Sequence, residues 1–83
     1  MSDDYSWIVR GKQRKKIIRV LNKAKIPSEI KEETKLGLNN VSDVLRSFVK
    51  KKIAKCINPK QKTGRLYRLT PKGMKIRDKI LED

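Results

Sequence analysis

The sequence contains no histidine and a single cysteine, Cys56. Without histidine the usual zinc ligand sets are missing, and one thiol cannot form an internal disulfide. There is also no Gly-rich phosphate-binding loop, no nucleophile beside a base that the sequence identifies, and no metal-binding pattern among the nine acids. We therefore expect no enzyme activity, no catalytic residue, no cofactor and no metal, and we interpret Cys56 as a small apolar residue of a strand.

Long apolar runs are lacking as well. No stretch approaches the roughly 20 apolar residues that cross a bilayer, and the acidic start Met-Ser-Asp-Asp does not have the form of a signal peptide. These features predict a cytoplasmic protein that makes no contact with a membrane. No effector site is evident, so no small-molecule ligand is predicted.

Aromatic residues are few, with only four in the 83 residues. Isoleucine, leucine and valine must therefore supply most of the buried area. A chain of this length holds one domain with one modest core. We predict a single domain over residues 1–83.

Acidic residues are heavily outnumbered: 23 Lys and Arg face nine Asp and Glu, which gives a net charge of +14. A field of this size attracts polyanions, among which nucleic acid is the commonest partner. A thermophilic surface is the alternative, but such surfaces enrich Glu together with Lys, and only four Glu occur here. Because the stretch 44–77 holds twelve Lys and Arg and no acid, the positive field is expected to concentrate there.

The stretch 36–53 has the clearest periodicity. Its apolar residues recur at i, i+3, i+4, i+7 and i+8 from Val41, which predicts an amphipathic helix over 39–51. Most residues on the opposite face are short and can hydrogen-bond a base edge. We expect Gly37 to end the preceding helix in the left-handed conformation and Asn39 to cap this one.

The rest of the chain predicts two further helices before this one and a hairpin and a helix after it. The helices are expected over 11–25, with Ile18 at the edge of the apolar stripe, and over 27–36, which starts at a proline. Two short β-forming runs flank a turn-rich loop and predict a hairpin over 53–70. A Thr-Pro pair then caps and starts a last helix, predicted over 71–82.

The N-terminal segment 1–9 is acidic and then apolar, so Trp7 and Ile8 need cover. They either pack onto the helices of their own domain or, together with Tyr5 and the terminal helices, pack against a second copy. Small DNA-binding domains often form homodimers that bind two half-sites, so both interpretations stay open.

The order helix, helix, turn, helix, hairpin, helix resembles the winged helix-turn-helix fold. Pro27-Ser28-Glu29-Ile30 and the stretch 36–45 look like the helix-turn-helix core of the multiple-antibiotic-resistance and arsenic-repressor superfamilies of transcriptional regulators. The stretch 64–73 is similar to their wing strand, with its Tyr-x-Leu-Thr-x-x-Gly pattern, and small archaeal members begin with a similar Trp-Ile-Val-Arg segment. The resemblance implies a mainly α fold with a three-helix core, a helix-turn-helix over 27–52, a wing over 53–70 and a C-terminal helix.

Two residues depart from the pattern of these families. Lys52 stands where relatives often have Gly, so the exit from the recognition helix must avoid positive φ or bear strain. Asp43 stands where relatives often have Arg, and its carboxylate can accept a hydrogen bond from cytosine N4.

The sequence thus predicts a transcriptional regulator that binds double-stranded DNA. The helix 39–51 would lie in the major groove, and the basic wing 58–65 would lie on the minor groove or the backbone. The predicted base contacts are Asn39, Asn40, Ser42, Asp43, Arg46 and Ser47. The predicted backbone or wing contacts are Lys12, Lys15, Lys50, Lys51, Lys60, Lys62, Arg65 and Arg68.

Two alternatives use the same charge. The protein could bind chromosomal DNA or structured RNA without sequence preference in the same fold, since charge alone does not distinguish DNA from RNA. It could also be an interaction module whose basic face docks an acidic protein.

Overall fold

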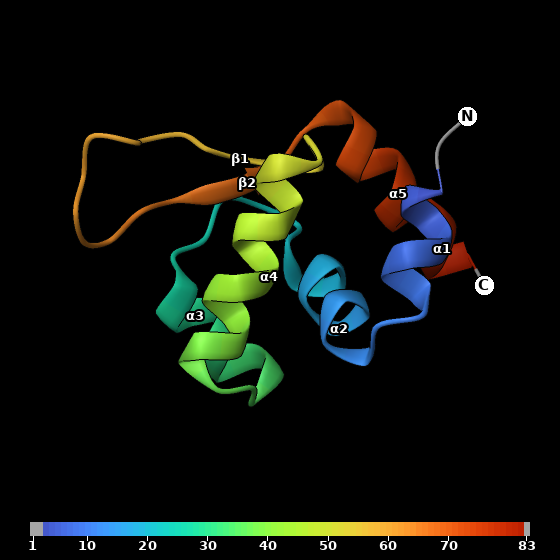
Figure 1. Ribbon diagram of the computed structural model, residues 1–83, viewed down its shortest axis with the longest axis horizontal. Helices are drawn as coiled ribbons and strands as arrows, with labels where there is room; N and C mark the ends of the chain where they lie inside the picture. The colour runs from blue at the N-terminus through green and yellow to red at the C-terminus, as the bar shows by residue number, and fades with distance from the viewer. Residues whose placement is uncertain (1–2, 83) are drawn as a thin grey trace.

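The computed structural model describes residues 3–82, which form five helices and one small sheet of two antiparallel strands (Figure 1). The fold is mainly helical with a hairpin, as predicted. The elements in chain order are α1 (Asp4–Val9), α2 (Lys12–Val20), α3 (Pro27–Thr34), α4 (Leu38–Lys50), β1 (Ala54–Cys56), β2 (Tyr67–Leu69) and α5 (Pro71–Glu82). The predicted segment 1–9 and the predicted domain 1–83 each include terminal residues that lie outside the described range.

The N-terminal segment is a helix, α1, that packs onto its own chain. Ile8 is completely buried in the core. The half-buried Trp7 meets the ring of Phe48 edge-on, with centroids 6.0 Å apart and an interplanar angle of 66°. Of the two interpretations left open for Ile8, packing onto its own domain is the one that the structure shows, because its side chain has no exposed surface. A homodimer through this segment and the terminal helices stays a prediction.

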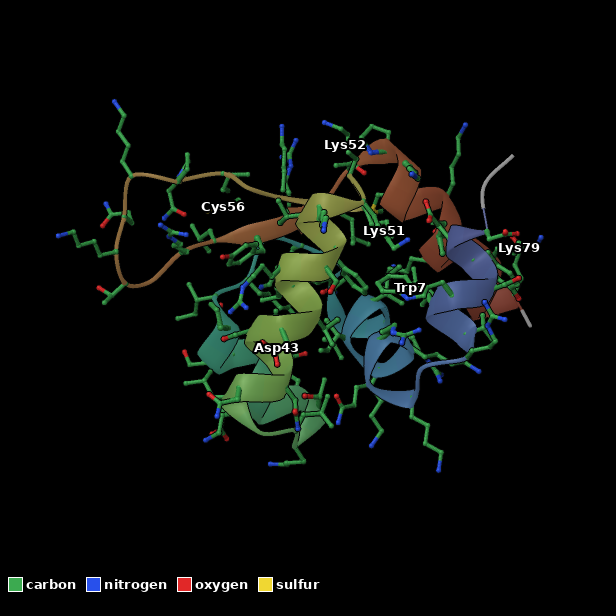
Figure 2. The ribbon with its side chains drawn as sticks, in the orientation of Figure 1. Trp7, Asp43, Lys51, Lys52, Cys56 and Lys79 are labelled. Atoms are coloured by element: carbon green, nitrogen blue, oxygen red, sulfur yellow. The ribbon has the colours of Figure 1, made fainter. Side chains whose placement is uncertain are left out.

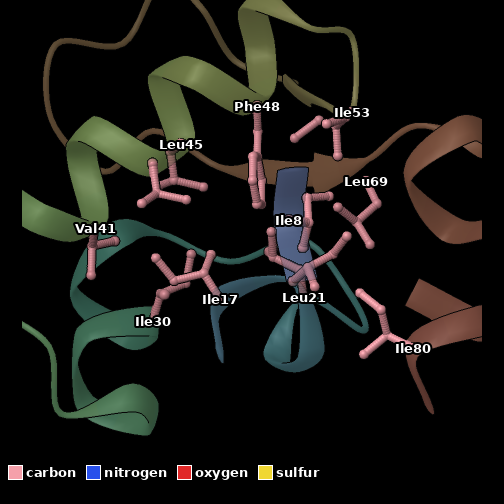
Figure 3. Packing of buried hydrophobic residues seen from close by; sticks show 13 residues of the cluster. Ile8, Ile17, Leu21, Ile30, Val41, Leu45, Phe48, Ile53, Leu69 and Ile80 are labelled. Carbon is pink, nitrogen blue, oxygen red and sulfur yellow. The ribbon is translucent and has the colours of Figure 1, made fainter. Parts of the chain in front are cut away.

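The core is a single hydrophobic cluster between the helices and the hairpin. Side chains of α4 point toward those of α1 and α2, with Phe48 among them (Figure 3). Ile18, expected at the edge of the stripe, is completely buried. The largest fully buried side chains are Phe48, Ile8, Ile17, Ile18, Leu21, Ile30, Leu45, Ile53 and Val41.

The predicted hairpin is confirmed. β1 and β2 pair in antiparallel register, with Ala54 opposite Leu69 and Cys56 opposite Tyr67. Ala54 and Leu69 are buried on the core side, so the sheet closes one side of the helical core. Cys56 is a half-buried strand residue, as expected.

The start of α5 explains the Thr-x-x-Gly part of the wing pattern. The hydroxyl of Thr70 accepts a hydrogen bond from the Gly73 amide at 3.2 Å, which caps the helix as predicted. A Cβ on Gly73 would lie 2.1 Å from the carbonyl oxygen of Ile53. Glycine is therefore required for α5 to pack against the residue that precedes β1.

The prediction of a helix over 11–25 is wrong beyond Val20. Lys25 instead pairs with β2: its amide donates to the Tyr67 carbonyl, and the Tyr67 amide donates back, both at 2.9 Å. The ammonium of Lys25, 5% exposed, is bonded to both carboxylate oxygens of Glu33 at 2.8 and 2.6 Å. These bonds hold the segment after α2 extended along the sheet edge, although its apolar spacing continues the helical pattern.

The turn before α4 also differs from the prediction. Lys35, and not Gly37, takes the left-handed conformation at φ 62°, and the predicted helix 27–36 ends at Thr34. Gly37 is extended at φ −67° and precedes α4 directly, so Asn39 is the second helical residue and no cap. At the other end of α4, Lys52 adopts φ 64°, so this non-glycine residue bears the strain considered for it.

None of the helices within residues 3–82 is long and apolar enough to cross a membrane.

Candidate nucleic-acid interface

Most of the polar face of α4 is exposed to solvent. It lies opposite the buried residues Val41, Leu45 and Phe48, and Figure 2 shows Asp43 on the side of α4 that faces away from the core. Two more of its residues, Ser42 and Ser47, are half-buried at its edges. The exposed members of this face are Asn39, Asn40, Asp43, Arg46 and Lys50.

Asp43 and Arg46 form an ion pair on this face. The guanidinium nitrogen lies 3.4 Å from the carboxylate, and the two side chains are 70% and 76% exposed. Water screens such a pair, so it contributes little to stability. The pair does place the carboxylate of Asp43 beside the guanidinium of Arg46, three residues apart on the helix, so that both groups can contact the same partner.

The loop between β1 and β2, residues 57–66, is the loop of the predicted wing and is called the wing loop below. It is ordered by the side chain of Asn58. Its Oδ1 accepts from the Leu66 amide at 2.7 Å, and its Nδ2 donates to the Gly64 carbonyl at 3.2 Å. Arg65 Nε also donates to the Gln61 carbonyl at 2.7 Å. Asn58 thus ties the two sides of the loop together and fixes the positions from which Lys60, Lys62 and Arg65 project.

A groove of about 360 Å³ separates this loop from α3 and α4. On one side lie Lys62 and Arg65 of the loop, and on the other lie Ser28 near the start of α3 and Ser42 in α4. The N-terminus of a helix carries partial positive charge, so the cations of the loop and the positive end of α3 face each other across this groove. The structure thereby brings three residues predicted from the sequence, Ser42, Lys62 and Arg65, to one place.

Lys51 is turned away from this surface and toward α1. Its ammonium lies 3.8 Å from the Asp4 carboxylate and 4.7 Å from the centroid of the Trp7 ring. Lys72 of α5 binds the same carboxylate at 2.6 Å and the Lys51 carbonyl at 3.0 Å. The structure therefore does not bring Lys51, a predicted backbone contact, together with the polar face of α4.

The remaining predicted cations lie on other elements. Lys12 and Lys15 belong to the first half of α2, where Lys12 is exposed and Lys15 half-buried. Arg68 lies in β2 next to Tyr67, and successive strand residues point to opposite faces. Tyr67 lines the groove beside α4, whereas Arg68 lines a different groove beside α5, so Arg68 is separated from the other wing cations.

Two residues of the site were missed in the sequence. Ser28 follows the proline that starts α3, and this position near a helix N-terminus was a usable signal. Asn58 begins the turn-rich loop, and asparagine side chains commonly hydrogen-bond nearby backbone in turns. Its bonds to Gly64 and Leu66 reach across six and eight residues, and no local pattern predicts those.

Comparison with known proteins identifies no relative: no protein-family model matches the chain, and no curated protein or solved structure does so either.

Proposed function

We propose that this protein is a winged helix-turn-helix protein, similar to the multiple-antibiotic-resistance and arsenic-repressor superfamilies, that binds double-stranded DNA and regulates transcription. In this proposal α3 and α4 are the helix-turn-helix, α4 is the recognition helix, and the β1–β2 hairpin is the wing. The antiparallel hairpin directly after α4 and the tight turn before it support the assignment.

One observation carries the proposal: the first turns of α4, through Leu38 and Ser42, and the basic wing loop line a single groove, and the exposed polar residues of α4 follow from that end of the helix. A helix fits the major groove of B-DNA, which is about 12 Å wide, and the wing then reaches the adjoining backbone or minor groove. Asn39, Asn40, Asp43 and Arg46 carry groups that hydrogen-bond base edges. Ser28, Lys62 and Arg65 have the chemistry to hold a phosphate in the groove.

A second candidate is binding without sequence preference, to chromosomal DNA or to structured RNA. The Asp43–Arg46 ion pair is the observation that bears on it, because each group already has a partner of opposite charge in the free protein. Reading a base then requires the pair to separate, at a small cost because both side chains are exposed. In this case the wing and Lys50 supply the affinity through phosphates alone.

Selection from a random duplex pool, followed by sequencing, tests the proposal. Enrichment of a defined sequence supports a regulator, whereas no enrichment together with equal binding of random duplex DNA and double-stranded RNA supports the second candidate. Arg46→Ala is expected to cost about 1 to 3 kcal/mol on the selected sequence and to relax preference at one base pair. Lys62→Ala is the matched control, since it should weaken all sequences alike, and equal loss on all sequences for Arg46→Ala would exclude base readout by this residue.

A further inference from the structure

The outer face of the hairpin carries two opposed cations. Lys55 of β1 pairs in register with Arg68 of β2, and both side chains are exposed. Like charges directly opposite each other destabilise a pair of strands. Within residues 3–82 no ion pair involves either side chain, so the repulsion is not relieved by an acid of this chain.

Further cations border this face. A groove of about 410 Å³ runs between the loop after α2, strand β2 and the start of α5, and its lining includes Lys23 and Arg68. The neighbouring surface of α5 adds Lys75. We define the outer basic face as Lys23, Lys55, Arg68 and Lys75.

The outer basic face and the polar face of α4 cannot contact one short duplex together. Ala54 and Leu69 point into the core, so Lys55 and Arg68 point away from it on the far side of the sheet. Tyr67 lies on the near side, where it lines the groove shared with α4. The molecule measures 33 × 24 × 18 Å, whereas DNA bends over a persistence length of about 500 Å, so a duplex on α4 cannot wrap around the hairpin.

We infer that the outer basic face is a second contact surface for a nucleic-acid backbone, and that one molecule joins two duplexes. This inference rests on the proposed function. Charge complementarity selects the occupant: exposed cations on separate elements match the regularly spaced phosphates of a duplex. A protein partner would need a desolvated apolar centre, and the exposed Ile57 and Met74 lie apart, one toward the wing tip and one in α5.

The experiment measures recruitment of a second duplex by the full chain. A biotinylated duplex is immobilised and saturated with protein, a fluorescent duplex that cannot hybridise with it is added, and the retained fluorescence is recorded. Affinity and salt dependence for a single duplex are measured separately by anisotropy. The variant is Lys55→Ser with Arg68→Ser, and the control, Lys16→Ser with Lys31→Ser, removes the same charge from α2 and α3.

The inference predicts that the unaltered chain and the control recruit the second duplex. The Lys55→Ser, Arg68→Ser variant should lose recruitment while it keeps its single-duplex affinity. Its melting temperature should not fall, because the substitutions remove the repulsion between the two strands. Recruitment that persists in this variant would overturn the inference, because it would come from a dimer in which each copy holds one duplex. A fall of about 1.8 in the single-duplex salt slope would also overturn it, because both cations would then contact the first duplex.

The outcome separates the inference from the proposed function. Normal single-duplex binding without recruitment by the unaltered chain overturns the inference alone. Absence of any duplex binding overturns the proposed function, and the inference with it.

Discussion

Asn58→Ala tests whether the wing is ordered before it meets DNA. The substitution removes the hydrogen bonds from the Leu66 amide and to the Gly64 carbonyl. A hydrogen bond contributes about 1 kcal/mol net, so the ordered loop loses roughly 2 kcal/mol relative to its open forms. If DNA binding requires the ordered loop, the variant must order its loop when it binds. The binding free energy then becomes less favourable by the same amount. We expect duplex affinity to fall on the order of tenfold, with about 30-fold as the upper bound.

Fluorescence anisotropy with a labelled duplex measures this effect, and thermal unfolding serves as the companion assay. The loop is exposed and opens locally, so the melting temperature should change little while affinity falls. Asn22→Ala is a suitable control, because this asparagine is exposed and lies in the loop after α2. Unchanged affinity for Asn58→Ala would refute the role of a preordered wing in binding.

Three substitutions test the packing of the fold. Ile8→Ala should lower the free energy of unfolding by about 2 to 5 kcal/mol in a urea titration, and no change would contradict the core position of α1. Gly73→Ala should cost about 1 to 3 kcal/mol, because the new methyl group would overlap the Ile53 carbonyl; tolerance would show that α5 can shift freely. Lys52→Gly should raise the free energy of unfolding by about 0.5 to 1 kcal/mol, since the positive φ suits glycine. The midpoint of unfolding in guanidinium chloride measures this change, and a lower midpoint would refute strain at this position.

The parts of the fold that local patterns specify could be predicted from the sequence. The apolar period of α4, the turn-rich loop of the hairpin and the Thr70-Pro71 start of α5 each depend on residues a few positions apart. The structure agrees with all three predictions. Helix ends were less accurate: the left-handed residue after α3 is Lys35, where a lysine gives no conformational signal.

The rest depends on contacts between distant residues. Lys25 lies outside α2 because its backbone pairs with that of Tyr67, 42 positions later. Lys51 and Lys72 share the carboxylate of Asp4, and this cluster could not be foreseen from a count of charges. Successive strand residues such as Tyr67 and Arg68 point to opposite faces, but only the packing of the sheet on the core decides which of them lies beside α4.

The central claim is that the polar face of α4 and the wing loop together bind a DNA backbone, and the salt dependence of duplex affinity tests it most directly. Four exposed cations of this surface are assigned to phosphates, namely Lys50, Lys60, Lys62 and Arg65, whereas Arg46 is assigned to a base edge. If each of the four meets one phosphate, log affinity falls with log salt at a slope of about −3.6, a loss of roughly 150-fold between 50 and 200 mM. Combining Lys50→Ala with Lys62→Ala should make this slope shallower by about 1.8, whereas Lys16→Ala with Lys31→Ala should leave it unchanged. An equal effect of the two double substitutions, or a slope near zero for the unaltered chain, would contradict the claim.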